Sequence, residues 1–446
     1  LIVNEVNGNE CQIFSNLNGA RVPLDASDLI RAMLVTYSVR EDKGGVEIEP
    51  YRVKMGAEID SFAVEWSNIE LKQFYMQFLP EKLSRESKDL RFDYSEHPIN
   101  LLYLLFLIQE NGEQAVSLAA FEDYLKKEKK VFAKLKEFDA DLQEWFNNTE
   151  LYHFLGYLIF NHKRKQGVSF TELYAKWKGC ATRAVFLHEV KRIVSNCILS
   201  DFVPTEQEQE DGIRTNREKL LKDIRFNLKT NWYVNASLST ILILNDILIT
   251  IRSTSLNRLP VWYLRAYNED REHISCQTPN DKEMNNKERW LADLADLEKF
   301  EVEDSQKDDF KNSILQLKKK IQGADEITRD LKQEIIGALT KFGLNSIGNI
   351  VLLNLSVNRG YGNSPFVDKR LAIINNYFDN KTDGAKRVKS RNAYIRPYTL
   401  KTFLSNLGGE ESEQHTFTKD NWRLSDIKSN AEAIASAVET FLNEAL

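Results

Sequence analysis

The apolar residues in the middle of this chain recur with the period of an α-helix. Between residues 100 and 255 they return every three or four positions, so that single helical faces are apolar, as in Leu101–Ile108 and Leu151–Leu158. Proline and glycine, which interrupt helices, number only 9 and 19 in 446 residues. This pattern predicts a mostly α-helical protein and excludes a collagenous, linker-dominated or wholly disordered chain.

A shorter region, near residues 258–380, has a different texture. Val261–Tyr267 is rich in β-branched and aromatic residues and predicts a strand, and Asn349–Leu353 predicts a second strand. Ser364 and Pro365 then suit the N-cap and the first position of a helix. We therefore expect a small α+β unit within an otherwise helical fold.

Polar segments indicate how the chain divides into domains. Residues 80–98 are charged and bracketed by two prolines, and Pro204–Arg217 is acidic and poor in apolar residues, which predicts a loop or a mobile linker. We place three domains at 1–95, 96–255 and 256–446, with the middle one as a helical connector. Its role stays open between a spacer, a dimer interface and a sensor.

Cysteine usage and hydropathy exclude several classes of protein. The four cysteines lie far apart and form no C-x-x-C pair, which argues against a zinc knuckle or a disulfide framework and fits a reducing cytoplasm. The longest apolar run is too short to span a bilayer, and no secretory signal is visible. We expect a cytoplasmic protein without a membrane segment. Its net charge of −6 means that any nucleic-acid contact requires a local basic patch.

The α+β unit contains residue types that could cleave a phosphodiester bond with one bound metal ion. Glu272 and Asn358 offer a carboxylate and a neutral oxygen donor, which suit a hard cation such as Mg²⁺. His273 offers an imidazole that could deprotonate the attacking water, and the metal would stabilise charge on the phosphate. Each residue alone is more often structural, since Glu96-His97 is a second Glu-His pair in an ordinary linker. Their order along a strand–loop–strand–helix frame favours a site.

Three segments of this unit resemble the HNH nucleases of GmrSD-type restriction proteins. Arg271–Gln277 is similar to that family's E-H-I-x-x-Q segment, and Ile347–Leu353 and Ser364–Arg370 are similar to its later blocks, G-N-L-x-L-L and P-F-x-x-K-R. Near the N-terminus, Ile13–Asn18 and Pro23–Arg31 resemble the block that closes the same family's ParB-like domain. Two blocks in the family's order support each other more than either does alone.

The resemblance implies a role for each residue of the candidate site. His273 would be the general base, and Glu272 and Asn358 would be ligands of Mg²⁺ or Mn²⁺. Asn349 would take the central HNH position and brace the loop that holds His273. Lys369 would contact a backbone phosphate. The fold implied is a helical connector followed by a ββα-metal (HNH) nuclease domain over 256–446, with a helical insertion and a basic tail.

The family's hallmark D-G-Q-Q-R motif does not occur in this chain, which begins at Leu1 rather than Met. That motif belongs to the nucleotide-hydrolysing ParB-like domain, upstream of the block found here. We therefore expect the chain to begin inside a longer gene product, with residues 1–95 as the C-terminal remnant of that domain. No nucleotide hydrolysis is assigned to these residues.

A basic patch follows the expected nuclease helix. Residues 364–401 contain nine Lys or Arg against three acids, as a phosphate-facing surface would. The residues expected to bind DNA are Arg370, Lys386, Arg387, Lys389 and Arg391. Tyr394 and Tyr398 could stack on a base or could pack under the tail. A solvated basic tail is the equal alternative, and the position of the patch directly after the nuclease helix favours DNA.

The leading hypothesis is a metal-dependent DNA endonuclease or nickase that acts in prokaryotic defence. Its partner would be double-stranded DNA, including modified or foreign phage DNA, and a homo-oligomer is compatible with it. One alternative is an inert helical scaffold or DNA-binding regulator, and another is a partner of a nucleotide-hydrolysing domain outside this chain. His153, His162 and His188 in the connector are interpreted as structural histidines rather than metal ligands.

Overall fold

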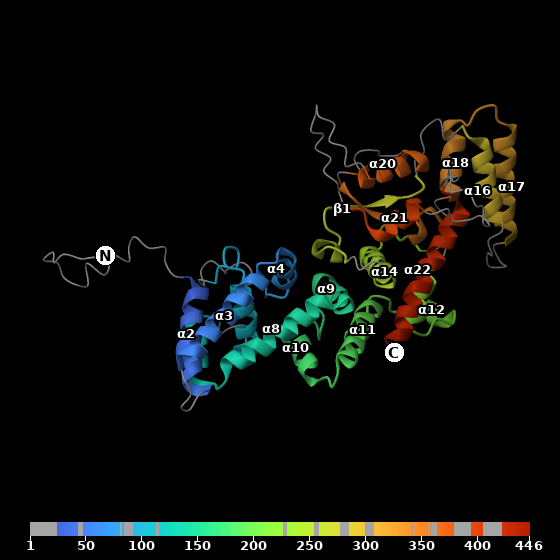
Figure 1. The fold of residues 1–446 in the computed structure, drawn as a ribbon. Coiled ribbons are helices and arrows are strands. Elements are labelled where there is room, and N and C mark those ends of the chain that lie inside the picture. Colours follow the sequence, from blue (N-terminus) through green and yellow to red (C-terminus); the bar gives the residue numbers. More distant parts are fainter. Residues whose placement is uncertain are drawn as a thin grey trace, which may run out of the picture. The chain divides into compact units, whose positions relative to one another are not determined.

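The computed structural model is mostly helical, with one small sheet (Figure 1). It describes residues 25–42, 48–80, 83, 92–112, 116–225, 230–253, 258–276, 285–298, 307–339, 343–355, 357, 364–378, 394–404 and 422–446. The chain forms two compact units, one of residues 1–148 and 169–175 and the other of residues 149–168 and 176–446. The mostly helical fold with a small sheet is confirmed, whereas domain boundaries near 95 and 255 stay predictions.

The first unit is built from six helices among its described residues. They are α2 (Ala26–Asp42), α3 (Ile48–Trp66), α4 (Ile69–Met76), α6 (Asn100–Asn111), α7 (Leu118–Lys127) and α8 (Val131–Asn147). The apolar side chains of α6 are buried on every face, so this helix lies inside the unit rather than along its surface. One buried polar pair in this core joins Trp66 to Asp139, whose carboxylate accepts from the indole N–H over 2.6 Å.

The second unit contains the remaining described helices. The first of them are α9 (Thr149–His162), α10 (Phe170–Gly179), which continues from the first unit, α11 (Arg183–Leu199), α12 (Glu206–Glu210), α13 (Asn216–Ile224) and α14 (Leu238–Arg252). The later ones are α16 (Lys287–Glu298), α17 (Lys307–Gly323), α18 (Arg329–Leu339), α20 (Phe366–Phe378), α21 (Pro397–Leu404) and α22 (Leu424–Glu444). Helix α17 packs against both α16 and α18 (Figure 1). Within the described residues, no helix is both long and apolar enough to cross a membrane.

Two antiparallel strands form the sheet. Strand β1 (Glu269–His273) pairs with β2 (Ile350–Asn354), with Glu269 opposite Asn354 and His273 opposite Ile350. Residues 350–353 of β2 are buried, which matches their continuous apolar sequence. The predicted second strand and the helix after Ser364-Pro365 are therefore confirmed to within a residue or two.

The predicted strand at Val261–Tyr267 is wrong. Val261–Leu264 forms the 3₁₀ helix η1, and the strand begins only at Glu269. Val261 and Leu264 are both buried, because side chains three positions apart lie on the same side of a 3₁₀ helix. The β-branched and aromatic composition therefore reflected burial in this turn rather than strand pairing.

The loop or linker predicted at Pro204–Arg217 is also wrong in part. This segment contains α12 and the start of α13. Both helices begin with a capping box, in which Thr205 pairs with Glu208 and Thr215 pairs with Glu218. The T-x-x-E spacing indicates the start of a helix at both places, whereas the acidic composition alone favoured a loop.

Candidate active site around His273

The candidate general base, His273, lies at the end of β1 with only 8% of its surface exposed. Its Nε2 lies 3.1 Å from Oδ1 of Asn345, which as an acceptor selects the tautomer protonated at Nε2. The ring of Tyr233 stacks on the imidazole with centroids 4.3 Å apart and planes 15° apart. In this tautomer Nδ1 carries the lone pair, and the described residues form no hydrogen bond with it.

The environment keeps this imidazole neutral. Burial is the main cause and lowers the pKa of His273 to about 4, and the ammonium of Lys369 acts in the same direction. The hydrogen bond with Asn345 opposes both. A neutral imidazole with an available lone pair is the form that accepts a proton from water.

Lys369 reaches the opposite side of β1 from helix α20. Its Nζ donates to Oε1 of Glu272 over 2.5 Å and to the carbonyl oxygen of His273 over 2.6 Å, and its side chain is 1% exposed. Neighbouring strand residues direct their side chains to opposite faces, so Glu272 meets α20 while His273 meets Tyr233. In this structure the buried ammonium pairs with the nearby carboxylate, and the expected contact of Lys369 with a DNA phosphate stays a prediction.

Asn349 braces the turn that follows His273. Its Oδ1 accepts from the backbone N–H of Ser275 over 2.8 Å, and its Nδ2 donates to the carbonyls of Ser275 and Leu344. The N–H of Ile274 also donates to the Asn349 carbonyl. The side chain is fully buried, so these bonds fix the turn in a dry environment. The structure thus gives Asn349 the bracing contacts that the resemblance implies, while its catalytic role stays a prediction.

Helix α22 packs against the segment that contains Asn349. It packs against the 3₁₀ helix η4 (Ile347–Asn349), and Nδ2 of Asn430 donates to the Gly348 carbonyl over 2.9 Å. A Cβ on Gly348 would lie 2.1 Å from the carbonyl oxygen of Ile427 and 2.7 Å from the backbone nitrogen of Ala431. Only glycine allows the two backbones to approach this closely.

Most of the other predicted site residues lie in parts of the chain that the structure does not describe. Asn358, Lys386, Arg387, Lys389 and Arg391 lie outside the described residues. Arg370 is 4% exposed, and its guanidinium lies 4.7 Å from the ring centroid of Phe366. The guanidinium thus packs inside the fold, and the role of Arg370 as a DNA contact stays a prediction.

The described residues include only one of the two expected metal ligands. They contain no group of three or more His, Cys, Asp or Glu side chains placed to hold a metal ion. Of the two expected ligands, Glu272 is paired with an ammonium group, and Asn358 is among the residues that the structure does not describe. The expected Mg²⁺ or Mn²⁺ therefore stays a prediction from the sequence.

Part of the expected basic patch is a buried ion cluster. Arg396 is 1% exposed and donates to the carboxylates of Glu269 and Asp246 and to the carbonyls of Tyr263 and Arg265. Tyr394 packs on the ring of Tyr263, with centroids 4.3 Å apart, and Tyr398 is buried. The packing alternative for these two tyrosines is the one that the structure supports.

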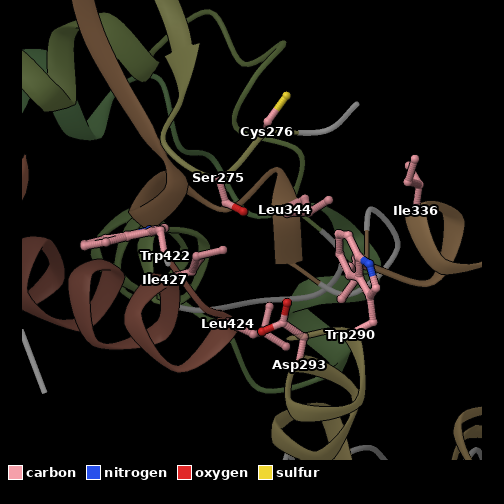
Figure 2. Close-up of a pocket in the computed structure, with 10 residues that line it drawn as sticks. Ser275, Cys276, Trp290, Asp293, Ile336, Leu344, Trp422, Leu424 and Ile427 are labelled. Carbon is pink, nitrogen blue, oxygen red and sulfur yellow. The ribbon is translucent and has the colours of Figure 1, made fainter. Parts of the chain in front are cut away.

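A small pocket is lined in part by the turn that follows His273. Figure 2 shows Ser275, Cys276, Trp290 and Asp293 among its lining residues. Its volume of about 10 Å³ holds no more than roughly one water molecule. This cavity is too small to receive a nucleotide.

Sequence reasoning missed Tyr233 and Asn345. Both lie far along the chain from His273 and stand in segments without a recognisable motif.

The comparisons with protein-family models, with curated proteins and with solved structures found no match for this chain.

Proposed function

We propose that this chain is an HNH-type nuclease that hydrolyses phosphodiester bonds in DNA, with His273 as its general base. The role we propose is defence of a prokaryotic cell against modified or foreign DNA in the cytoplasm. The observation that carries the proposal is a neutral imidazole fixed by Asn345, at the end of a strand whose following turn is held by a buried asparagine.

In the proposed reaction, Nδ1 of His273 takes a proton from a water molecule as that water attacks phosphorus. The phosphorus–oxygen bond to the water forms, the bond to the leaving oxygen of the nucleotide breaks, and that oxygen takes a proton from solvent water to leave as a hydroxyl group. Nε2 stays protonated throughout because Asn345 accepts its hydrogen, and this bond keeps the ring oriented. A negatively charged phosphate beside the ring would favour the imidazolium that results.

The other residues have supporting roles in this proposal. Lys369 holds the Glu272 carboxylate and the His273 carbonyl in place, and Asn349 holds the turn. A bound Mg²⁺ or Mn²⁺, which the family resemblance implies, would supply charge stabilisation on the phosphate.

A second candidate is a catalytically inert scaffold or DNA-binding regulator. The pairing of Glu272 with Lys369 favours it, because that ion pair occupies the carboxylate expected to hold the metal. The buried position of Arg370 also favours it, since one of the expected DNA contacts is withdrawn.

Nicking of supercoiled plasmid by the full chain distinguishes the two. We expect nicking with Mg²⁺ or Mn²⁺, none with EDTA, and a loss of about a hundredfold or more in His273→Ala. His188→Ala, at an exposed histidine of α11, is the matched control and should retain activity.

Silence of the wild-type chain on plain plasmid would call for modified phage DNA as the substrate. Silence there as well, together with no Mn²⁺ binding by calorimetry, would reject the nuclease in favour of the scaffold. Nicking that His273→Ala retains would instead reject His273 as the base.

A further inference from the structure

The connection between α13 and α14 lies against the candidate site. Trp232 anchors it, because its side chain is 1% exposed and its indole N–H donates to the Asp223 carbonyl over 2.6 Å. The backbone N–H of Trp232 donates to the Asn345 carbonyl over 2.9 Å. The residue that holds Nε2 of His273 is therefore itself held by this connection.

The next residue, Tyr233, is fixed at three points. Its ring stacks on the His273 imidazole, its carbonyl accepts from Nη1 of Arg271 over 2.6 Å, and its hydroxyl lies 3.4 Å from the Arg271 carbonyl. Yet 37% of Tyr233 is exposed. Tyr233 is therefore held against the imidazole while part of its surface stays open to solvent.

Resting on the nuclease function proposed above, we propose that Tyr233 is a positioning residue for His273. The hydrogen bond from Nε2 to Asn345 fixes one point of the imidazole and leaves the ring able to turn about that point. A ring stacked at 4.3 Å fixes the plane of the imidazole and hence the direction of the Nδ1 lone pair. General-base catalysis needs that direction, because a proton moves along the line to the attacking water.

The same geometry assigns a function to a segment that the sequence places in the connector. Trp232 orients Asn345, and Tyr233 covers one face of the imidazole, so residues 230–235 belong to the His273 site although they precede β1.

The test is the NMR signal of His273 in the full chain labelled with ¹³C at histidine Cε1, assigned with His273→Gln. A stacked ring shields the protons beneath it, so the wild-type Hε1 signal should lie upfield of the signals of the exposed histidines. Tyr233→Leu should remove this shift, and Tyr233→Phe should retain it. Tyr267→Leu is the matched control, since Tyr267 is 41% exposed and stacks on Trp262 rather than on His273.

Plasmid nicking by the same variants gives the second measurement. Tyr233→Leu should lower kcat about tenfold or more with little change in KM. Tyr233→Phe, which keeps the aromatic ring, should have the kcat of the wild type. An unchanged His273 signal in Tyr233→Leu would overturn the proposal, as would full kcat in that variant. If the wild-type chain shows the upfield signal but cuts no DNA, the stack is real and the nuclease function is what fails.

Discussion

Lys369 places an ammonium group in the protein interior, between the Glu272 carboxylate and the His273 carbonyl. A lysine on the first turns of a helix is usually exposed, and the sequence alone suggested a DNA-facing role. In the structure its neighbour Arg370 is buried as well and lies over Phe366. At the scale of single residues, the local charge pattern thus did not reveal which cations are used inside the fold.

The first stability prediction concerns the ion pair between Lys369 and Glu272. Lys369→Met leaves the mostly buried Glu272 carboxylate without its partner and should lower the free energy of unfolding by about 3 kcal/mol. Adding Glu272→Gln should recover part of that loss, because the remaining groups are then neutral. Urea unfolding of the wild type, both single variants and the double variant measures the coupling. Losses that simply add would mean that the two side chains do not interact in solution.

At the scale of elements, the closest approach in the site is between η4 and α22. Gly348→Ala would set a Cβ 2.1 Å from a backbone oxygen of α22, which cannot move without shifting the helix. We expect a loss of about 2–3 kcal/mol in the free energy of unfolding, from overpacking at a backbone contact. The matched control is Gly337→Ala in α18, where no atom lies near the added Cβ, and a gain of about 0.5–1 kcal/mol is expected. Equal stabilities of the two variants would contradict the close approach.

Arg396 links three elements, because it bonds Asp246 on α14 and Glu269 on β1 from its place beside α21. Arg396→Met leaves two buried carboxylates unpaired and should cost about 3–5 kcal/mol of unfolding free energy. Arg225, which pairs with Glu439 on the surface, is the control, and Arg225→Met should cost no more than about 1 kcal/mol. Thermal and urea unfolding of both variants measure the difference. A small cost at Arg396 would mean that the carboxyl groups take up protons and become neutral instead.

At the scale of the whole molecule, buried histidines make stability depend on pH. Burial lowers the pKa of His153, His162 and His273 to about 4, whereas imidazoles in the unfolded chain titrate near 6.5. As the pH falls below 6.5, the histidines bind protons in the unfolded state but not in the folded state. The stability present above pH 6.5 is therefore lost progressively as the pH approaches 4.

His153 permits a direct test of this sign. Its Nδ1 donates to the Thr149 carbonyl over 2.6 Å, and its Nε2 accepts from the Leu259 N–H over 3.1 Å, which only a neutral ring can do. Between pH 6.5 and 4, His153→Gln should reduce the pH slope of the unfolding free energy by up to about 1.4 kcal/mol per pH unit. Urea titrations at several pH values give the slope. An unchanged slope would mean that His153 takes up its proton in the folded state.

The sequence by itself determined the helical class, strand β2 and the start of α20, because these depend on periodicity and capping within a few residues. The tertiary structure decided the contents of the site. His273 is held by Asn345 over a separation of 72 residues, and Lys369 reaches Glu272 over 97. Burial, pairing of charges and ring stacking are set by such distant partners. A local pattern reports only how a segment can fold, so it could propose His273 and Asn349 but could not find Tyr233 or foresee where Arg396 would lie.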